Sequence, residues 1–139
     1  MKGLAPEPDL ACTSVEEVMH RGLVSCPPGT SLRTVARILA AHRIHAVVVA
    51  DDHAHEIAGV WGVVSDIDVV VRLATASPDE TAGTAAQLPP CIVAPDETVA
   101  HAAQLMAEHG IAHLVVADRA SGRPLGVIST LDVAEALSS

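Results

Sequence analysis

Positive charge and aromatic side chains are scarce in this sequence. Its 139 residues include 8 Lys and Arg against 17 Asp and Glu, a formal net charge of −9, and they include no Phe, no Tyr and a single Trp. Proteins that bind nucleic acids or anionic membranes use basic surfaces to neutralise phosphates. We therefore expect neither nucleic acid nor a membrane as a partner. Because half of the residues are hydrophobic, we expect a globular core of aliphatic side chains.

Motifs that would indicate secretion, membrane insertion or catalysis are also missing. Cys12, Cys26 and Cys91 form no CxxC pair, residues 1–14 lack the pattern of a signal peptide, and no apolar run is long enough to span a bilayer. No P-loop, no Rossmann glycine pattern and no recognisable catalytic triad occurs. We expect reduced cysteines, a cytoplasmic location, no required cofactor and no enzymatic activity.

One stretch of the sequence occurs twice. Residues 62–68 (GVVSDID) and 126–132 (GVISTLD) each read as a buried strand that ends in Ser, followed by a helix with Asp three residues after that Ser. Val and Ile favour strands, and Ser at a helix N-cap with an acid three residues later is a capping box. Residues 48–51 (VVAD) likewise recur as residues 115–118. The sequence is therefore a tandem duplication, with a longer hairpin loop in its first copy.

Each copy predicts the order strand, helix, strand, strand, helix. In the first copy we expect strands and helices over residues 23–26, 31–42, 46–50, 57–64 and 66–74. We divide the chain into a flexible lead-in, a first copy, a small-residue linker and a second copy, at residues 1–14, 15–74, 75–86 and 87–139. A three-stranded sheet cannot bury both faces alone. The expected fold is α/β (α+β), with the two copies packed sheet to sheet around a pseudo-two-fold axis.

A known family shows the same order of motifs. The strand, proline, Ser/Thr cap and helix, followed by residues 110–118 (GIAHLVVAD) and 125–132 (LGVISTLD), resemble a CBS domain, and two in tandem resemble a Bateman module. The resemblance runs from about Val15 to Leu137 and is closer in the second copy, because Trp61 and a longer loop depart from the pattern in the first. It implies a regulatory module that binds AMP, ADP, ATP or S-adenosylmethionine between the copies and modulates a separate partner.

The resemblance also assigns roles to residues. It implies that Asp68 and Asp132 bind the ribose hydroxyls and that Ser65 and Ser129 lie on the phosphate side, which fits the general affinity of helix N-termini for phosphate. Strand residues that it places around the base and along the cleft are Ser25, Cys26, Ile92, Val93, Ala46, Val47, His113 and Leu114.

Charge near the expected phosphate distinguishes the two copies. Asp66 follows Ser65 directly and would repel a phosphate, whereas Thr130, its counterpart, is neutral and can donate a hydrogen bond. We therefore expect the nucleotide in the second copy's site. The nearby basic candidates are Arg123, Arg72 and the histidines. So few positive groups favour AMP, or a cationic adenosyl compound, over ATP.

Other interpretations remain open. The Ser-x-x-Asp segments can be capping boxes without a ligand, in a protein that serves as a dimerisation scaffold. His53 and His55 could ligate a transition metal from a His-rich loop, although two such ligands alone are too few and a solvated loop is favoured. His42 and His109 lie near helix C-termini, where a partly charged imidazole interacts favourably with the helix dipole. From the apolar helix stripes we expect a homodimer; the partner enzyme or transporter is not identified.

Overall fold

Helices and strands follow one another in nearly the same order in both copies. The computed structural model describes residues 10–51, 59–75, 80–86 and 89–138. In chain order its elements are α1 (Val15–Val18), β1 (His20–Arg21), β2 (Ser25–Cys26), α2 (Leu32–His42), β3 (Ala46–Ala50), β4 (Val60–Ser65), α3 (Asp66–Thr75), α4 (Ala82–Ala85), β5 (Ile92–Val93), α5 (Val99–His109), β6 (His113–Ala117), β7 (Pro124–Ser129) and α6 (Thr130–Ser138).

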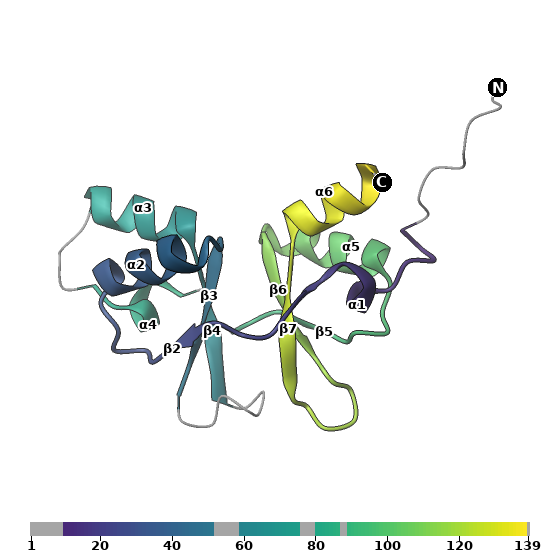
Figure 1. Ribbon diagram of the computed structural model, residues 1–139, viewed down its shortest axis with the longest axis horizontal. Helices are drawn as coiled ribbons and strands as arrows, with labels where there is room; N and C mark the ends of the chain where they lie inside the picture. The colour runs from purple at the N-terminus through teal and green to yellow at the C-terminus, as the bar shows by residue number, and fades with distance from the viewer. Residues whose placement is uncertain (1–9, 52–58, 76–79, 87–88, 139) are drawn as a thin grey trace.

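The strands form two sheets, one in each half of the molecule (Figure 1). The first sheet has the order β2-β3-β4 and the second has the order β1-β7-β6-β5. In both, the short first strand of the copy runs parallel to the next, which pairs antiparallel with the last. Equivalent strands thus repeat the same pairing, which is what a duplicated sequence requires.

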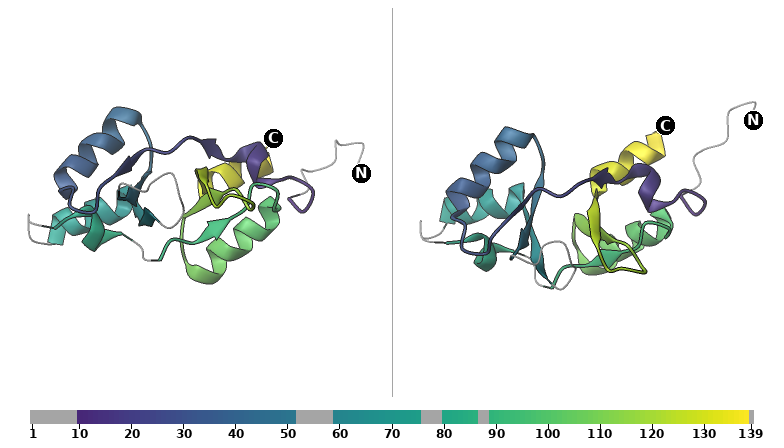
Figure 2. Two further views of the ribbon diagram at one scale, coloured as in Figure 1. Left: turned by 90° about the horizontal axis from the view of Figure 1, so that it is seen from below. Right: turned by 60° about the horizontal axis from the view of Figure 1, so that its bottom comes forward.

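The two sheets pack face to face through aliphatic side chains. Buried Val48, Val60 and Val63 of the first half form one cluster with Val115 of the second. Two further clusters fill the space between each sheet and its helices. Figure 2 shows the helices of each half on the outer side of its sheet. The α+β fold with two sheet-packed copies is confirmed, and the hydrophobic effect of the valine-rich interface holds the halves together.

The two copies exchange their first short helices. Val15 of α1 is fully buried in the core of the second half, and Ala82 of α4 is fully buried in the core of the first. Backbone bridges repeat the exchange, since Ser14 pairs with Thr98 and Ser31 pairs with Thr81. The segment expected as a linker, residues 75–86, thus contains α4, a short helix that packs into the core of the first half. Its small side chains carry no apolar periodicity, and they become helical because the first half's core covers them.

Helix ends explain how the site is positioned. Ser31 caps α2 and Thr98 caps α5 through hydrogen bonds from the backbone N–H groups of the third residue on. Both helices end in the left-handed conformation, at Arg43 with φ 53° and at Gly110 with φ 62°. β4 and β7 then run directly into α3 and α6. Each sheet edge therefore delivers a helix N-terminus to the region between the halves.

Strand β1 adds one element that the pattern did not predict. Its two residues pair antiparallel with β7, where Arg21 lies opposite Gly126. A Cβ at Gly126 would overlap with the carbonyl oxygen of His20. The glycine of the repeated stretch thus permits the close approach of another backbone, and this approach brings the β1 side chains to the start of α6.

Candidate functional site

A cleft of about 560 Å³ lies between the two halves. We call it the first cavity. Its walls come from the β1–β2 segment, the α2–β3 turn, the end of β7 and the start of α6. Its lining residues are His20, Arg21, Gly22, Leu23, Val24, His42, Arg43, Ile44, His45, Ala46, His113, Val127, Ser129, Leu131, Asp132 and Glu135. The volume falls within the range of ordinary small-molecule sites.

Asp132 provides a buried carboxylate on the wall of this cavity. The residue is 3% exposed, and its Oδ2 accepts a hydrogen bond of 2.8 Å from the backbone N–H of Ser129. In return, the Asp132 N–H donates to the Ser129 hydroxyl at 3.2 Å. This reciprocal capping box fixes the carboxylate at the first turn of α6. It leaves Oδ1 to face a group from another element.

That group is His20 of β1. Its Nδ1 lies 2.9 Å from Asp132 Oδ1, while the imidazole itself is largely exposed. The contact joins β1, which precedes the first half in the chain, to the first turn of α6 in the second half. A ligand hydroxyl that binds Oδ1 would share this oxygen with His20 or replace it.

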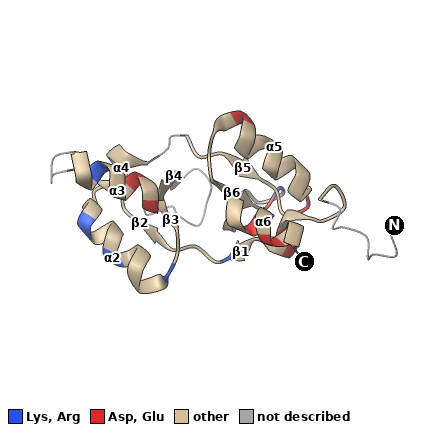
Figure 3. Cartoon of the chain, turned by 90° about the horizontal axis from the view of Figure 1, so that it is seen from above, with Lys and Arg blue, Asp and Glu red and all other residues tan. Residues whose placement is uncertain are grey.

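Two arginines give the same cavity positive charge. Arg21 lies on β1, and Arg43 lies at the left-handed end of α2 (Figure 3 shows basic positions at both places). Neither forms an ion pair with another described residue, whereas Arg72 pairs with Glu80 at 2.9 Å. The acidic lining residues are Asp132 and Glu135. The cavity therefore combines apolar walls with groups of both signs.

A second cavity, of about 510 Å³, occupies the equivalent place in the other copy. Its lining residues are Val63, Pro89, Pro90, Cys91, His109, Ile111 and His113. Among the described residues, this lining contains no Arg, Lys, Asp or Glu. Burial raises the pKa of the Cys91 thiol, so that the thiol stays neutral at physiological pH. The duplicated frame thus carries two cavities with different chemistry.

His113 lines both cavities. Burial lowers the pKa of its imidazole below the ordinary value of 6.5, and His45 adds to this effect, while the carboxylates of Asp66, Asp132 and Asp68 oppose it. A neutral imidazole can donate one hydrogen bond and accept another. His113 can therefore act as a polar wall shared by the two cavities.

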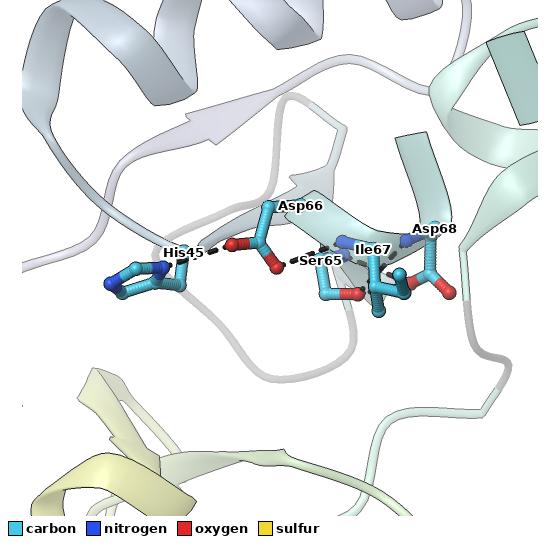
Figure 4. Close-up of polar contacts among 5 residues, drawn as sticks. All are labelled: His45, Ser65, Asp66, Ile67 and Asp68. Carbon is cyan, nitrogen blue, oxygen red and sulfur yellow. Dashed lines mark hydrogen bonds and ion pairs between the residues drawn. The ribbon is translucent and has the colours of Figure 1, made fainter. Parts of the chain in front are cut away.

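Asp66 and Asp68 are held by partners within the first copy (Figure 4). Asp66 Oδ2 lies 2.9 Å from His45 Nδ1, and this hydrogen bond lowers the pKa of the Asp66 carboxyl. Asp68 Oδ2 accepts hydrogen bonds from both the N–H and the hydroxyl of Ser65, each at 2.9 Å. The Ser–Asp pair repeats the capping box of α6, but neither residue lines either cavity.

The structure divides the residues that the sequence analysis named. Of the residues named as ligand contacts, four line a cavity, namely Ser129, Asp132, His113 and Ala46, and the helix-end residues His42 and His109 also line one each. The others lie outside both linings: Thr130, Ser65, Asp66, Asp68, Ser25, Ile92 and Arg123, together with Cys26, Val47, Val93 and Leu114, which are buried in the cores. Leu23, Val24 and Cys91, each just before the strand residues that the resemblance names, line the cavities instead.

Sequence reasoning missed Arg21 and Arg43 as residues of the first cavity, and it named His20 and His45 only within the group of nearby histidines. Of the basic groups expected nearby, Arg72 is engaged by Glu80 and Arg123 lines neither cavity, whereas the histidines do contribute, since His20, His42, His45 and His113 line the first cavity. One signal was available. Arg43 precedes Ile44 where Gly110 precedes Ile111 in the second copy. A residue that replaces a helix-terminal glycine projects its side chain beyond the helix end.

Among the described residues, no group of three or more His, Cys, Asp and Glu is arranged to hold a metal ion. His53 and His55 lie outside the described residues. Within the described residues, no helix has the length and apolar character that a bilayer crossing requires.

Fold and cavities together define a duplicated α+β module with a cleft between its copies, and comparisons with known proteins place it further. The CBS domain sequence profile matches residues 15–75 and 85–139. The chain belongs to the CBS domain family, as a tandem pair. A sequence search of curated proteins found no match.

Solved structures agree with this assignment. A CBS domain protein from Pyrobaculum aerophilum, complexed with AMP, is 30% identical, with a TM-score of 0.74 and coverage of 86% of this chain and 88% of that one. A CBS-domain containing protein from Agrobacterium tumefaciens is 28% identical, with a TM-score of 0.76 and coverage of 89% and 92%. A CBS domain pair in complex with 5′-methylthioadenosine and S-adenosyl-L-methionine is 22% identical, with a TM-score of 0.77 and coverage of 88% and 94%.

Proposed function

We propose that this protein is a regulatory module that binds an adenosine-containing ligand in the first cavity. One observation carries the proposal. The buried Asp132 carboxylate of the second half and the β1–β2 and α2–β3 segments of the first half line the same cleft of about 560 Å³. The AMP complex of the relative from Pyrobaculum aerophilum supports the ligand class.

The lining residues suggest how such a ligand would lie. A carboxylate accepts hydrogen bonds from two vicinal hydroxyls, so Asp132 is suited to the ribose. Leu23, Ile44 and Leu131 offer apolar contacts to a flat base. Arg21 and Arg43 then remain for the phosphate side. Ser129 completes the ribose end through its capping contact with Asp132.

Charge favours AMP among the adenosine nucleotides. The lining of the first cavity contains two arginines, Arg21 and Arg43, and two acidic groups, Asp132 and Glu135, so it has no excess of positive charge beyond the two groups available to a phosphate. A monophosphate carries about two negative charges, which two guanidinium groups can neutralise, whereas a triphosphate adds charge that the lining does not match. AMP is therefore the preferred ligand in this proposal, ahead of ATP.

Regulation follows from the position of the cavity. A ligand that contacts both halves stabilises one relative arrangement of the halves over others, and that difference is what a partner can sense. The partner is a separate enzyme or transporter, and this chain contributes binding rather than catalysis. We also propose that the chain acts as a homodimer in the cytoplasm.

The capping contacts favour one second candidate, a scaffold without a ligand. Both Ser-x-x-Asp segments close their capping boxes within the chain, and His20 already contacts Asp132. These contacts stabilise α3 and α6 whether or not a ligand binds.

A thermal-shift panel distinguishes the candidates. AMP, ADP, ATP, S-adenosylmethionine and divalent metals are each added to the full-length chain. A ligand at a hundredfold its Kd stabilises a protein by about 2.7 kcal/mol, so AMP is expected to raise the melting temperature clearly, and ATP less. If no compound of the panel raises the melting temperature, the scaffold is favoured. If only a metal raises it, a metal-responsive module is favoured.

A further inference from the structure

Arg43 has an unusual backbone conformation for its residue type. Among the described residues it is the only non-glycine with positive φ, at 53°. The equivalent helix end in the second copy has Gly110 in the same left-handed conformation, with φ 62°. This region is unfavourable for a residue with a Cβ and is ordinarily occupied by glycine. The first copy therefore keeps an arginine where the fold alone would favour glycine.

The Arg43 side chain lines the first cavity together with Arg21. Both residues are exposed, and neither forms an ion pair with another described residue, whereas Arg119 pairs with Asp96 at 3.0 Å. The chain carries a net charge of −9, so acidic partners for these two cations are plentiful elsewhere. Two unpaired guanidinium groups at one cavity make an anion the complementary ligand group.

The second cavity lacks this feature. Gly110 replaces Arg43 there, and its lining contains no basic residue other than His109 and His113. The difference between the cavities is thus a difference in charge on an otherwise repeated frame. The left-handed conformation is energetically unfavourable for Arg43, and this residue also adds positive charge to the first cavity. An unfavourable backbone conformation at such a position indicates a functional constraint.

We propose that Arg43, supported by Arg21, is the residue that makes the first cavity select a phosphorylated adenosine ligand over the same nucleoside without phosphate. This inference rests on the proposed function and names its ligand class. The lining of the first cavity thus offers a carboxylate for the ribose and two guanidinium groups for the phosphate.

Calorimetry with AMP and with adenosine tests the inference on the full-length chain. Arg43→Gly should weaken AMP binding by about tenfold or more, the scale of a lost charge-assisted hydrogen bond, and leave adenosine binding unchanged. Its melting temperature should not fall, because glycine suits the left-handed region. Arg21→Gln, a second variant that keeps the α2 end intact, should weaken AMP binding in the same selective way.

Arg37→Ala is the matched control. It removes the same charge from an exposed position of α2 that lines neither cavity, and AMP binding should be unchanged. Equal affinity of the wild type for AMP and adenosine would overturn the inference while leaving the proposed function standing. Full AMP affinity in Arg43→Gly would overturn it too. If the wild type binds neither compound, the proposed function fails and the inference fails with it.

Discussion

At the scale of single residues, His113 is the group that the two cavities share. Its imidazole is surrounded by Asp66, Asp68, Asp132 and His45, and burial nevertheless lowers its pKa below the ordinary 6.5. Its counterpart in the first copy is Ala46, which lines the first cavity alone. The pseudo-two-fold symmetry is therefore broken where the halves meet.

The lowered pKa of His113 predicts a dependence of stability on pH. Below about pH 6.5 the unfolded chain binds a proton at His113 that the folded chain resists, so this residue destabilises the fold as the pH falls through that range. His113→Gln cannot bind the proton. We expect the wild type to lose stability relative to this variant between pH 7 and pH 5, roughly the range over which His titrates. Denaturant unfolding at several pH values measures the difference, and parallel curves would contradict it.

The site was predictable where chemistry follows a local motif. Ser129 and Asp132 could be named because the capping box and the family resemblance act within four positions of sequence. Arg43 and His20 were not singled out, because their place in the first cavity depends on packing between the halves. His20 reaches Asp132 only because β1 pairs with β7 against Gly126. Long-range strand pairing of this kind leaves no local signal.

At the scale of elements, the sequence predicted the repeated strands, the longer helices and the short helix α1, but it did not predict β1 or α4. β3 has the predicted bounds, because five consecutive apolar residues indicate a buried strand. Helices of four residues are not stable alone and depend on tertiary contacts. The sequence marks the start of α1 with a capping box formed by Ser14 and Glu17, whereas α4 has the sequence AGTA and no apolar stripe.

Two longer helices leave apolar side chains uncovered. Ile67, Val70 and Val71 on α3 are 60%, 61% and 50% exposed, and Leu131 and Leu137 on α6 are 49% and 55% exposed. Both helices lie on the same side of the molecule (Figure 1). An apolar surface shared by two helices is typical of an interface between protein chains.

The proposed homodimer gives this surface a partner. We expect the wild type to be a dimer by light scattering at micromolar concentration, and we expect Val70→Asp to shift it toward monomer, because a carboxylate would be buried without a partner. Ala120→Asp, on the exposed β6–β7 hairpin at the opposite end, adds the same charge and should leave the dimer intact. A monomeric wild type, or a dimer that tolerates Val70→Asp, would contradict the proposal.

At the scale of the whole molecule, the two copies share one fold but differ in the side chains that line their cavities. Two copies that bury one another's sheets also create two cavities, with lining residues from both halves in the first. The first cavity is lined partly by charged groups, whereas the lining of the second consists of Val63, two prolines, Cys91, Ile111 and two histidines. We therefore expect one chain to bind one AMP tightly, in the first cavity.

Calorimetric titration of AMP into the wild type, Asp132→Ala and Asp68→Ala tests this claim most directly. Both aspartates close the same contact with a preceding Ser, so each variant carries a similar capping defect of about 1 kcal/mol, which melting measures separately. Only Asp132 lines a cavity. We predict one tight AMP site per wild-type chain, a large loss of affinity in Asp132→Ala and near wild-type affinity in Asp68→Ala. Equal, small losses in the two variants, or two equally tight sites in the wild type, would contradict the account.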